Sequence, residues 1–281
     1  MGEPLVEQVR YRPGPALVPF VASYTGYRLD GVPPGVHPGL PSTSLTFIVS
    51  FDAPLDIAVM PGGRQAPDTF WAMVGGLHTM PATVRHDGRQ HGVQIELTPR
   101  GAMALFGTRP GDLASTVVHV EEVDASFARE LIERLSAVRS WSRRFAELDS
   151  LLLRTAGRGR RIRAAIPPSA ADAWRLLHET HGAITVGGLA GELGWSRRHL
   201  TEQFRRSYGI GPKECARVIR FERARALLGS GRRPTLAEVA AACGYADQSH
   251  LTRDWKRFAG STPSAWLADE LPYVQDSPVD L

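Results

Sequence analysis

The chain has 281 residues, enough for two domains, and its 43% hydrophobic and 22% charged residues are typical of a folded globular protein. The net charge is only +4, but residues 1–155 contain 14 arginines and 16 acidic residues, whereas residues 156–281 contain 19 arginines and lysines and 13 acidic residues. This composition excludes extended disorder, and the basic C-terminal half is typical of a module that binds a polyanion such as DNA.

Residues 1–122 are rich in glycine and proline, with short apolar runs between turn signals. Runs of this kind predict strands, because β-branched and aromatic residues suit a pleated, half-buried surface while Gly and Pro favour turns. The expected strands are residues 45–51, 55–59, 69–76, 82–86 and 93–97. Several short strands at this spacing favour a small barrel or sandwich.

Residues 126–155 follow a helical pattern instead. Ser126 is the expected N-cap, and apolar residues from Phe127 to Leu152 recur at three- and four-residue spacings. The pattern predicts a pair of helices, the second of which begins near Trp141.

The chain is therefore expected to be an α+β protein with two domains joined by a linker. The expected boundaries are residues 1–155 for an N-terminal, mainly-β domain that ends in the helical pair 126–155, residues 156–168 for a basic, Gly- and Pro-rich linker, residues 169–270 for an all-α domain, and residues 271–281 for a frayed tail.

One sequence pattern occurs twice in the basic half. The pairs at an offset of 50 are Leu189/Val239, Ala190/Ala240, Leu193/Cys243, Gly194/Gly244 and Trp195/Tyr245. After one inserted residue, the pairs at an offset of 51 are His199/His250, Leu200/Leu251, Thr201/Thr252, Phe204/Trp255, Arg206/Arg257, Gly209/Gly260 and Pro212/Pro263. Each copy predicts a helix-turn-helix, a motif that lays one helix in the major groove of DNA.

Within each copy, some positions have a mechanical role. A glycine in the turn supplies a positive φ, the next polar residue caps the second helix, and residues spaced i, i+4 face the core. The structural positions are Gly194, Ser196, Leu200 and Phe204 in the first copy, and Gly244, Asp247, Leu251, Trp255 and Pro263 in the second.

The outer face of each second helix is expected to contact DNA. The candidates are Arg197, Arg198, Thr201, Glu202 and Arg205 in the first copy, and Gln248, Ser249, Thr252, Arg253 and Lys256 in the second. Arginine can grip guanine through two acceptors, glutamine can do so for adenine, and hydroxyls serve either base. Glu202 could accept from cytosine, but we favour a pair with Arg198 on the same helix. The first face is more cationic than the second, so we expect unequal half-sites in one asymmetric operator.

Residues 170–268 resemble the AraC/XylS family of bacterial transcription regulators. The resemblance is carried by Gly244 and Tyr245, by residues 249–253, by Phe258 and by residues 263–266, although Trp255 stands where the family usually has Phe. It implies seven short helices, two helix-turn-helix units joined by a long helix at about residues 212–229, and insertion into two successive major grooves of double-stranded DNA.

The resemblance also implies what the front of the chain does. The strand-rich residues 1–122 are similar to a cupin-like barrel, of a type found in actinobacterial members, that binds a small effector or dimerises. A homodimer would then form through residues 126–155, and an effector signal would reach the DNA-binding unit through this helical pair and the linker. RNA polymerase is a further candidate partner, although activation and repression both stay open.

We expect no catalytic site, metal or cofactor. The histidines of the first half, His37, His78, His86, His91 and His119, lack the His-x-His pattern of a cupin metal site, and no nucleophile elbow, Walker loop or dinucleotide fingerprint occurs. Cys215 and Cys243 are too few for a disulfide framework or a zinc site built on paired cysteines, and we expect buried, inert thiols.

The chain has no apolar run near the ~18 residues that suggest a membrane helix and no signal-peptide pattern, so we expect a cytoplasmic protein. The main alternative is a constitutive regulator whose N-terminal domain only dimerises. An enzyme with a DNA-binding tail is a weaker alternative. A DNA-repair methyl acceptor would need reactive cysteines, and residues 1–214 contain none.

Overall fold

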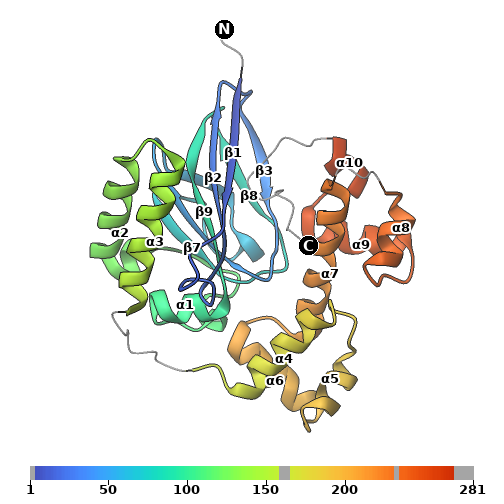
Figure 1. Cartoon of the computed structure of the whole chain (residues 1–281). Coiled ribbons are helices and arrows are strands. Elements are labelled where there is room, and N and C mark those ends of the chain that lie inside the picture. The colour runs from blue at the N-terminus through green and yellow to red at the C-terminus, as the bar shows by residue number, and fades with distance from the viewer. Residues whose placement is uncertain (1–3, 158–164, 231–233, 269–281) are drawn as a thin grey trace.

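The computed structural model describes residues 4–157, 165–230 and 234–268, and it places a β-rich N-terminal part beside a C-terminal set of helices (Figure 1). Two antiparallel sheets form the N-terminal part. The larger sheet contains, in spatial order, β1 (Leu5–Tyr11), β2 (Val21–Asp30), β9 (Gln90–Leu97), β4 (Leu45–Ser50), β7 (Ala72–Gly75) and β10 (Val117–His119). The smaller sheet contains β3 (Gly35–Gly39), β8 (Ala82–His86), β5 (Leu55–Val59) and β6 (Asp68–Phe70). The mainly-β N-terminal part expected from the sequence is confirmed.

Four of the five expected strands are confirmed as β4, β5, β8 and β9. The run 69–76 was expected as one strand, and the structure divides it between β6 and β7, which belong to different sheets. Trp71 lies at this crossing and is 42% exposed, because the chain leaves one sheet there and enters the other. Sequence periodicity does not distinguish a strand that changes sheets from one that continues.

The sequence did not predict β1, β2, β3 or β10. In β2, Gly26 interrupts the apolar pattern, and the structure shows why a glycine stands there. The ring of Trp141 occupies the space that a side chain at Gly26 would need. A contact between residues so far apart in the chain leaves no local signal, so the strand is stabilised by packing that propensity does not report.

Three helices pack against the face of the large sheet that points away from the small one (Figure 1). They are α1 (Pro99–Phe106), α2 (Val120–Ser136) and α3 (Trp141–Gly157). Alternate residues of β9, including Val93 and Ile95, are fully buried against the apolar stripes of these helices. A separate apolar layer, which includes Tyr27 and Phe70, fills the space between the two sheets.

The expected start of the helical pair was wrong in its capping residue. Helix α2 begins at Val120 and is interrupted at Asp124, whose φ of −157° and ψ of 92° are not helical. The Asp124 carboxylate accepts hydrogen bonds from the Phe127 amide at 3.0 Å and from the Ser126 hydroxyl at 2.7 Å. Asp124 therefore caps the second part of α2, and Ser126 lies inside its first turn. The helix expected from about Trp141 is confirmed as α3.

Seven further helices follow in the described C-terminal residues, as the family resemblance implied. They are α4 (Pro168–Glu179), α5 (Val186–Glu192), α6 (Arg197–Tyr208), α7 (Pro212–Gly229), α8 (Leu236–Ala242), α9 (Gln248–Ala259) and α10 (Pro263–Ala268). The long helix expected at 212–229 is α7. The middle of the expected linker, residues 158–164, and the expected tail lie outside the described residues.

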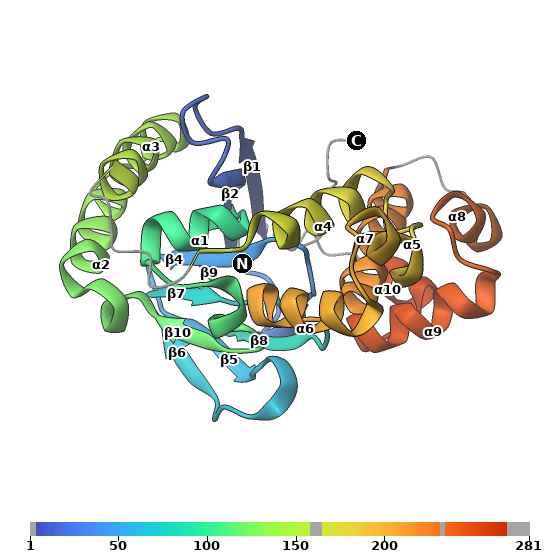
Figure 2. The ribbon, with the colours of Figure 1, turned by 90° about the horizontal axis from the view of Figure 1, so that it is seen from below.

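Among the described residues, the N-terminal part contacts both α6 and α7. The short 3-10 turn Pro110–Leu113 packs on the end of α6, where a side-chain carbon at Gly111 would lie 2.5 Å from the carbonyl oxygen of Arg206. Figure 2 shows α6 alongside the strands from below. The loop between β3 and β4 meets α7, and Leu40 belongs to the same apolar cluster as Phe221 and Trp255.

Candidate nucleic-acid interface

The first helix-turn-helix consists of α5, a turn and α6. Thr185 caps α5 by accepting from the Gly188 amide, and Ser196 caps α6 by accepting from the His199 amide at 3.2 Å. Gly194 in the turn has a φ of +66°, which only glycine adopts at little cost. The cap and the turn together fix the direction in which α6 leaves α5.

The second helix-turn-helix consists of α8, a turn and α9. Thr235 and Glu238 form a reciprocal capping box at the start of α8. Gly244 has a φ of +74° in the turn, and Asp247 caps α9 by accepting from the His250 amide at 2.7 Å. The two units therefore repeat the same local devices, although their caps are a serine and an aspartate.

Apolar side chains hold each recognition helix from its inner face. Leu200 and Phe204 of α6 are fully buried, and so are Leu251 and Trp255 of α9. The Trp255 ring meets Phe221 of α7 edge-on at 5.1 Å. Pro263 is also buried, at the first position of α10. The opposite faces of α6 and α9 are consequently turned to solvent.

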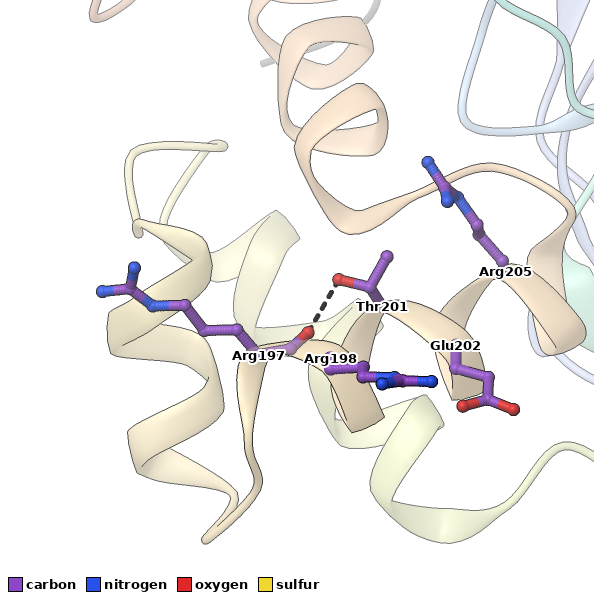
Figure 3. A pocket seen from close by; sticks show the side chains of 5 residues that line it. All are labelled: Arg197, Arg198, Thr201, Glu202 and Arg205. Atoms are coloured by element: carbon purple, nitrogen blue, oxygen red, sulfur yellow. Dashed lines mark hydrogen bonds between the residues drawn. The ribbon is translucent and has the colours of Figure 1, made fainter.

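The outer face of α6 forms one shallow hollow, lined by Arg197, Arg198, Thr201, Glu202 and Arg205 (Figure 3). These are the five candidates that the sequence indicated on this helix. The Thr201 hydroxyl donates to the Arg197 carbonyl at 2.8 Å and keeps its oxygen as an acceptor. The side chains extend in different directions, and those of Arg197 and Arg205 point away from each other (Figure 3).

Two of the arginines lie against neighbouring helices. The Arg197 guanidinium occupies the place that a side chain at Gly187 of α5 would need. The Arg205 guanidinium lies beside Gly211, where α7 is about to begin. The absence of a side chain at Gly187 makes room for the Arg197 guanidinium, and Arg198 is left as the arginine at the centre of the face.

The pair expected between Arg198 and Glu202 does not form in the part of the chain that the structure describes. Both side chains are exposed, and an exposed pair on one helix is worth only about 0.3–0.5 kcal/mol. Hydration of the two separate charges competes well with so small a gain. The Glu202 carboxylate is therefore available as an acceptor in this structure, and its pairing with Arg198 stays a prediction.

The outer face of α9 is less charged. Gln248, Ser249, Arg253 and Lys256 are exposed, and Thr252 is half-buried. No side chain among the described residues holds the polar ends of Gln248, Ser249 or Arg253 by a hydrogen bond or ion pair. These three groups are therefore free to meet the edges of bases or the phosphates of a nucleic acid.

Sequence reasoning missed a buried ion pair that joins α7 to α9. Arg217 donates from Nη2 and Nε to the two carboxylate oxygens of Asp254, at 2.7 and 3.1 Å. Hydrogen bonding to Asp254 raises the pKa of Arg217, and the guanidinium also lies 5.3 Å from the Phe258 ring centre. Asp254 lies between Leu251 and Phe258 on the inner stripe of α9, and that spacing is the signal that could have revealed it.

Some of the basic residues of the C-terminal half are thus structural. Besides Arg217, Arg220 donates to the Gly182 carbonyl at 3.2 Å and lies over the Tyr245 ring. The charge surplus of this half therefore overstates the number of cations that can meet DNA.

Other candidate chemistry is sparse in the described residues. Within them, no group of three His, Cys, Asp or Glu side chains is placed to hold a metal ion. Burial raises the pKa of both Cys215 and Cys243. None of the helices in the described ranges combines the length and apolar character needed to cross a bilayer.

Comparison with known proteins agrees with this geometry. Residues 189–269 match the family described as "Helix-turn-helix domain". A transcriptional regulator of the helix-turn-helix type from Bacillus subtilis, YbfI, is 37% identical over 68 residues, which are 24% of either chain. A second such regulator, SAS0078 from Staphylococcus aureus, is 27% identical over 89 residues, 32% of this chain and 12% of its own length. The chain thus matches a quarter or less of the length of these relatives.

Solved structures extend the likeness to the N-terminal part. ToxT from Vibrio cholerae superimposes with a TM-score of 0.53 at 12% identity, over 87% of this chain and 96% of its own. A second crystal form of ToxT gives 0.54 over similar shares. At such low identity the likeness concerns the fold alone. Residues 189–269 of this chain are thus similar to a helix-turn-helix domain that also occurs in bacterial transcriptional regulators.

Proposed function

We propose that this protein is a sequence-specific DNA-binding transcription regulator that reads two successive major grooves with α6 and α9. The observation that carries the proposal is the pair of helix-turn-helix units, each with an exposed polar face on its recognition helix. Helix α7 joins the two units and, with 18 residues, is roughly 27 Å long. Successive grooves recur about every 34 Å, so the DNA bends or the units adjust when both helices insert.

The two faces suit different half-sites. On α6, the side chain of Arg198 would suit guanine, and that of Glu202 would suit the amino group of cytosine. Arg197 and Arg205, at the edges of that face, are suited to phosphates. On α9, Gln248, Ser249 and Arg253 present donors and acceptors with little net charge. Thr252 and Lys256 complete the second face. One chain would then recognise an asymmetric operator.

Genome-wide mapping of the fragments that the full-length protein binds tests this proposal. The expected result is a shared motif of two unlike elements whose centres lie about 10.5 base pairs apart. A palindrome, or binding sites with no common sequence, would contradict recognition by two unlike helices of one chain.

The contact between the β3–β4 loop and α7 supports control of DNA binding by the N-terminal part. The amide and the hydroxyl of Thr43 donate to the two carboxylate oxygens of Glu222, at 3.1 and 2.9 Å. Glu222 lies on α7, between the two helix-turn-helix units. A change in this loop would therefore reach the DNA-binding unit directly, by a shorter route than the helical pair 126–155 and the linker that we expected from the sequence.

The space between the two sheets is the candidate site for an effector. It holds a cavity of about 30 Å³ lined by side chains that are mostly apolar, among them Ile48, Met73 and Leu40. One structure of ToxT is described as bound to an unsaturated fatty acid. The cavity would have to widen to admit a molecule of that kind, and Leu40, which lines it, also packs in the core of the second unit. Binding of a ligand between the sheets and detachment of the β3–β4 loop from α7 would therefore occur together.

The small size of this cavity favours a second candidate, a constitutive regulator whose N-terminal part only dimerises. Helices α2 and α3 are the expected dimer surface, and their outer side carries Arg134, Glu130 and Arg154 in linked ion pairs. The interface of a homodimer formed there would be polar. Contact with RNA polymerase is a separate expectation. Adding oleate to the full-length protein separates the two candidates. A sensor responds with a higher Tm and altered DNA affinity, whereas a dimeriser shows neither change.

A further inference from the structure

A second cavity, of about 370 Å³, lies between the large sheet and the start of α3. Three of the residues that line it, Glu7, Arg28 and His91, stand side by side on β1, β2 and β9, because Glu7 pairs with Arg28 and Arg28 with His91 in the strand register. Arg139 and Arg144 face them from the connection between α2 and α3 and from α3 itself. This cavity is separate from the apolar one between the sheets.

Arg144 is the buried element of this cavity. It is 3% exposed, and its guanidinium donates to the carbonyls of Leu135 and Val138 and to Nε2 of His91, at 3.0, 2.5 and 3.2 Å. All three acceptors are neutral. An arginine has five N–H groups, so two remain without a protein acceptor in the described residues. No carboxylate of the described chain lies within ion-pair distance of this buried cation. Asp52 and Glu7 stabilise its charge only from farther away, and burial, the larger effect, lowers the pKa of Arg144.

The tautomer of His91 follows from its two neighbours. Its Nε2 faces Arg144, which can only donate, so Nε2 is an acceptor and the ring proton sits on Nδ1. Nδ1 lies 2.8 Å from a carboxylate oxygen of Asp52 and donates to it. Burial lowers the pKa of His91, which keeps the ring neutral. The charge of Asp52 is therefore engaged by a neutral imidazole and not by an arginine.

The other two arginines are also weakly compensated. Arg28 makes one long ion pair in the described part of the chain, with Asp30 at 4.0 Å, and Arg139 has no hydrogen-bond or ion-pair partner there. Three guanidinium groups thus share the cavity with only two carboxylates, those of Glu7 and Asp52. The faces of Phe51 and Trp141 lie 4.3 and 4.6 Å from the Arg144 guanidinium and hold it in place.

We propose that this cavity binds a small metabolite through a carboxylate or phosphate group, with Arg144 as the buried anchor and Arg28 and Arg139 closing over it. The two spare N–H groups of Arg144 give the anion a fixed pair of donors, and oxyanions match the planar guanidinium well. The volume suits a ligand of metabolite size. Binding at this site rests on the cavity and its charges and not on the proposed function in DNA binding.

Calorimetric titration of the full-length protein with citrate, and separately with inorganic phosphate, at constant ionic strength tests the proposal. The double variant Arg28→Gln, Arg139→Gln should lose one equivalent of bound anion, or weaken it at least tenfold. Arg143→Gln is the matched control, because Arg143 is exposed, lies next to Arg144 and does not line the cavity. It should bind as the unchanged protein does.

The two probes distinguish a carboxylate from a phosphate ligand, and coincident melting curves show that the variants are folded. The proposal is overturned if neither anion binds, or if the double variant and the Arg143 control bind both anions equally well. In the latter case Arg144 serves only to hold the carbonyl groups at the end of α2.

Discussion

Arg217 of α7 and Asp254 of α9 form a two-pronged ion pair, with Nη2 of the arginine 2.7 Å from Oδ1 of the aspartate. The side chains are 17% and 5% exposed, so the pair lies at the edge of the core of the second helix-turn-helix. Two parallel hydrogen bonds fix the rotation of α9 relative to α7, and with it the direction of Gln248 and Arg253. The position of the second recognition face thus depends on a charge pair as well as on apolar packing.

Replacing Arg217 with Ala should lower the free energy of unfolding by about 3–5 kcal/mol, because it leaves the buried Asp254 carboxylate without a partner. Urea denaturation of the full-length protein measures the loss. Arg253→Ala, on the outer face of α9, is the control. Its free energy of unfolding should lie within about 0.5 kcal/mol of that of the unchanged protein. Equal stability of both variants would show that the pair is exchanged for water without cost.

Replacing Arg253 with Ala should instead weaken binding to the operator by about 1–3 kcal/mol and relax the preference at one base pair. The reason is that its guanidinium is exposed and free on the outer face of α9. Fluorescence anisotropy with operator DNA and with random DNA of the same length measures both effects. An equal loss on random DNA would make Arg253 a phosphate contact.

Replacing Leu200 or Trp255 with Ala should destabilise the C-terminal domain by roughly 2–5 kcal/mol, because both side chains are fully buried and leave cavities behind. Thermal melting followed by circular dichroism measures this. Thr201→Ala is a suitable control on the outer side of α6. An unchanged melting curve for the Leu200 variant would mean that α6 faces the other way.

The pH dependence of the contact between the two parts of the chain should follow Glu222. Burial raises the pKa of this carboxyl group to about 7 from its usual value near 4.5, against the opposing effect of its hydrogen bonds from Thr43. The packed state therefore binds a proton more tightly than an exposed Glu222 does. Its stabilisation is fully present below about pH 4.5 and is lost as the pH rises towards 7.

Glu222→Gln removes the titration and keeps an acceptor for Thr43. We expect this variant to be about 1–3 kcal/mol more stable than the unchanged protein at pH 8, with a smaller difference at pH 5. Urea denaturation at both pH values checks this, with Glu202→Gln on the exposed face of α6 as control. If the variant were more stable than the unchanged protein by the same amount at pH 8 and at pH 5, Glu222 would be ruled out as the titrating group.

The sequence predicted best where structure depends on neighbouring residues. The turn glycines Gly194 and Gly244 and the caps Ser196 and Asp247 act on residues within three positions, so the doubled pattern located both helix-turn-helix units. The capping of α2 was missed, because Asp124 and Ser126 are equally good caps by type and only the backbone decides between them.

The sequence predicted least where residues far apart meet. The ring of Trp141 explains why residue 26 is a glycine, and the hydrogen bonds to Glu222 explain the position of Thr43 in the β3–β4 loop. Neither contact can be read from the sequence, because the partners are far apart in the chain. The charges of the C-terminal half show the same limit. Arg217 and Arg253 are the same residue type on neighbouring helices, yet Arg217 is held in an ion pair at the edge of the core and Arg253 is free on the surface.

The most direct test of the central claim is the affinity of the full-length protein for an operator whose two elements are moved apart by 5 base pairs, half a helical turn. If α6 and α9 of one chain read successive grooves on one face of DNA, this insertion should reduce the affinity to that of an operator with one element scrambled. Affinity that is unchanged by the insertion, or that depends on a single element, would contradict the account.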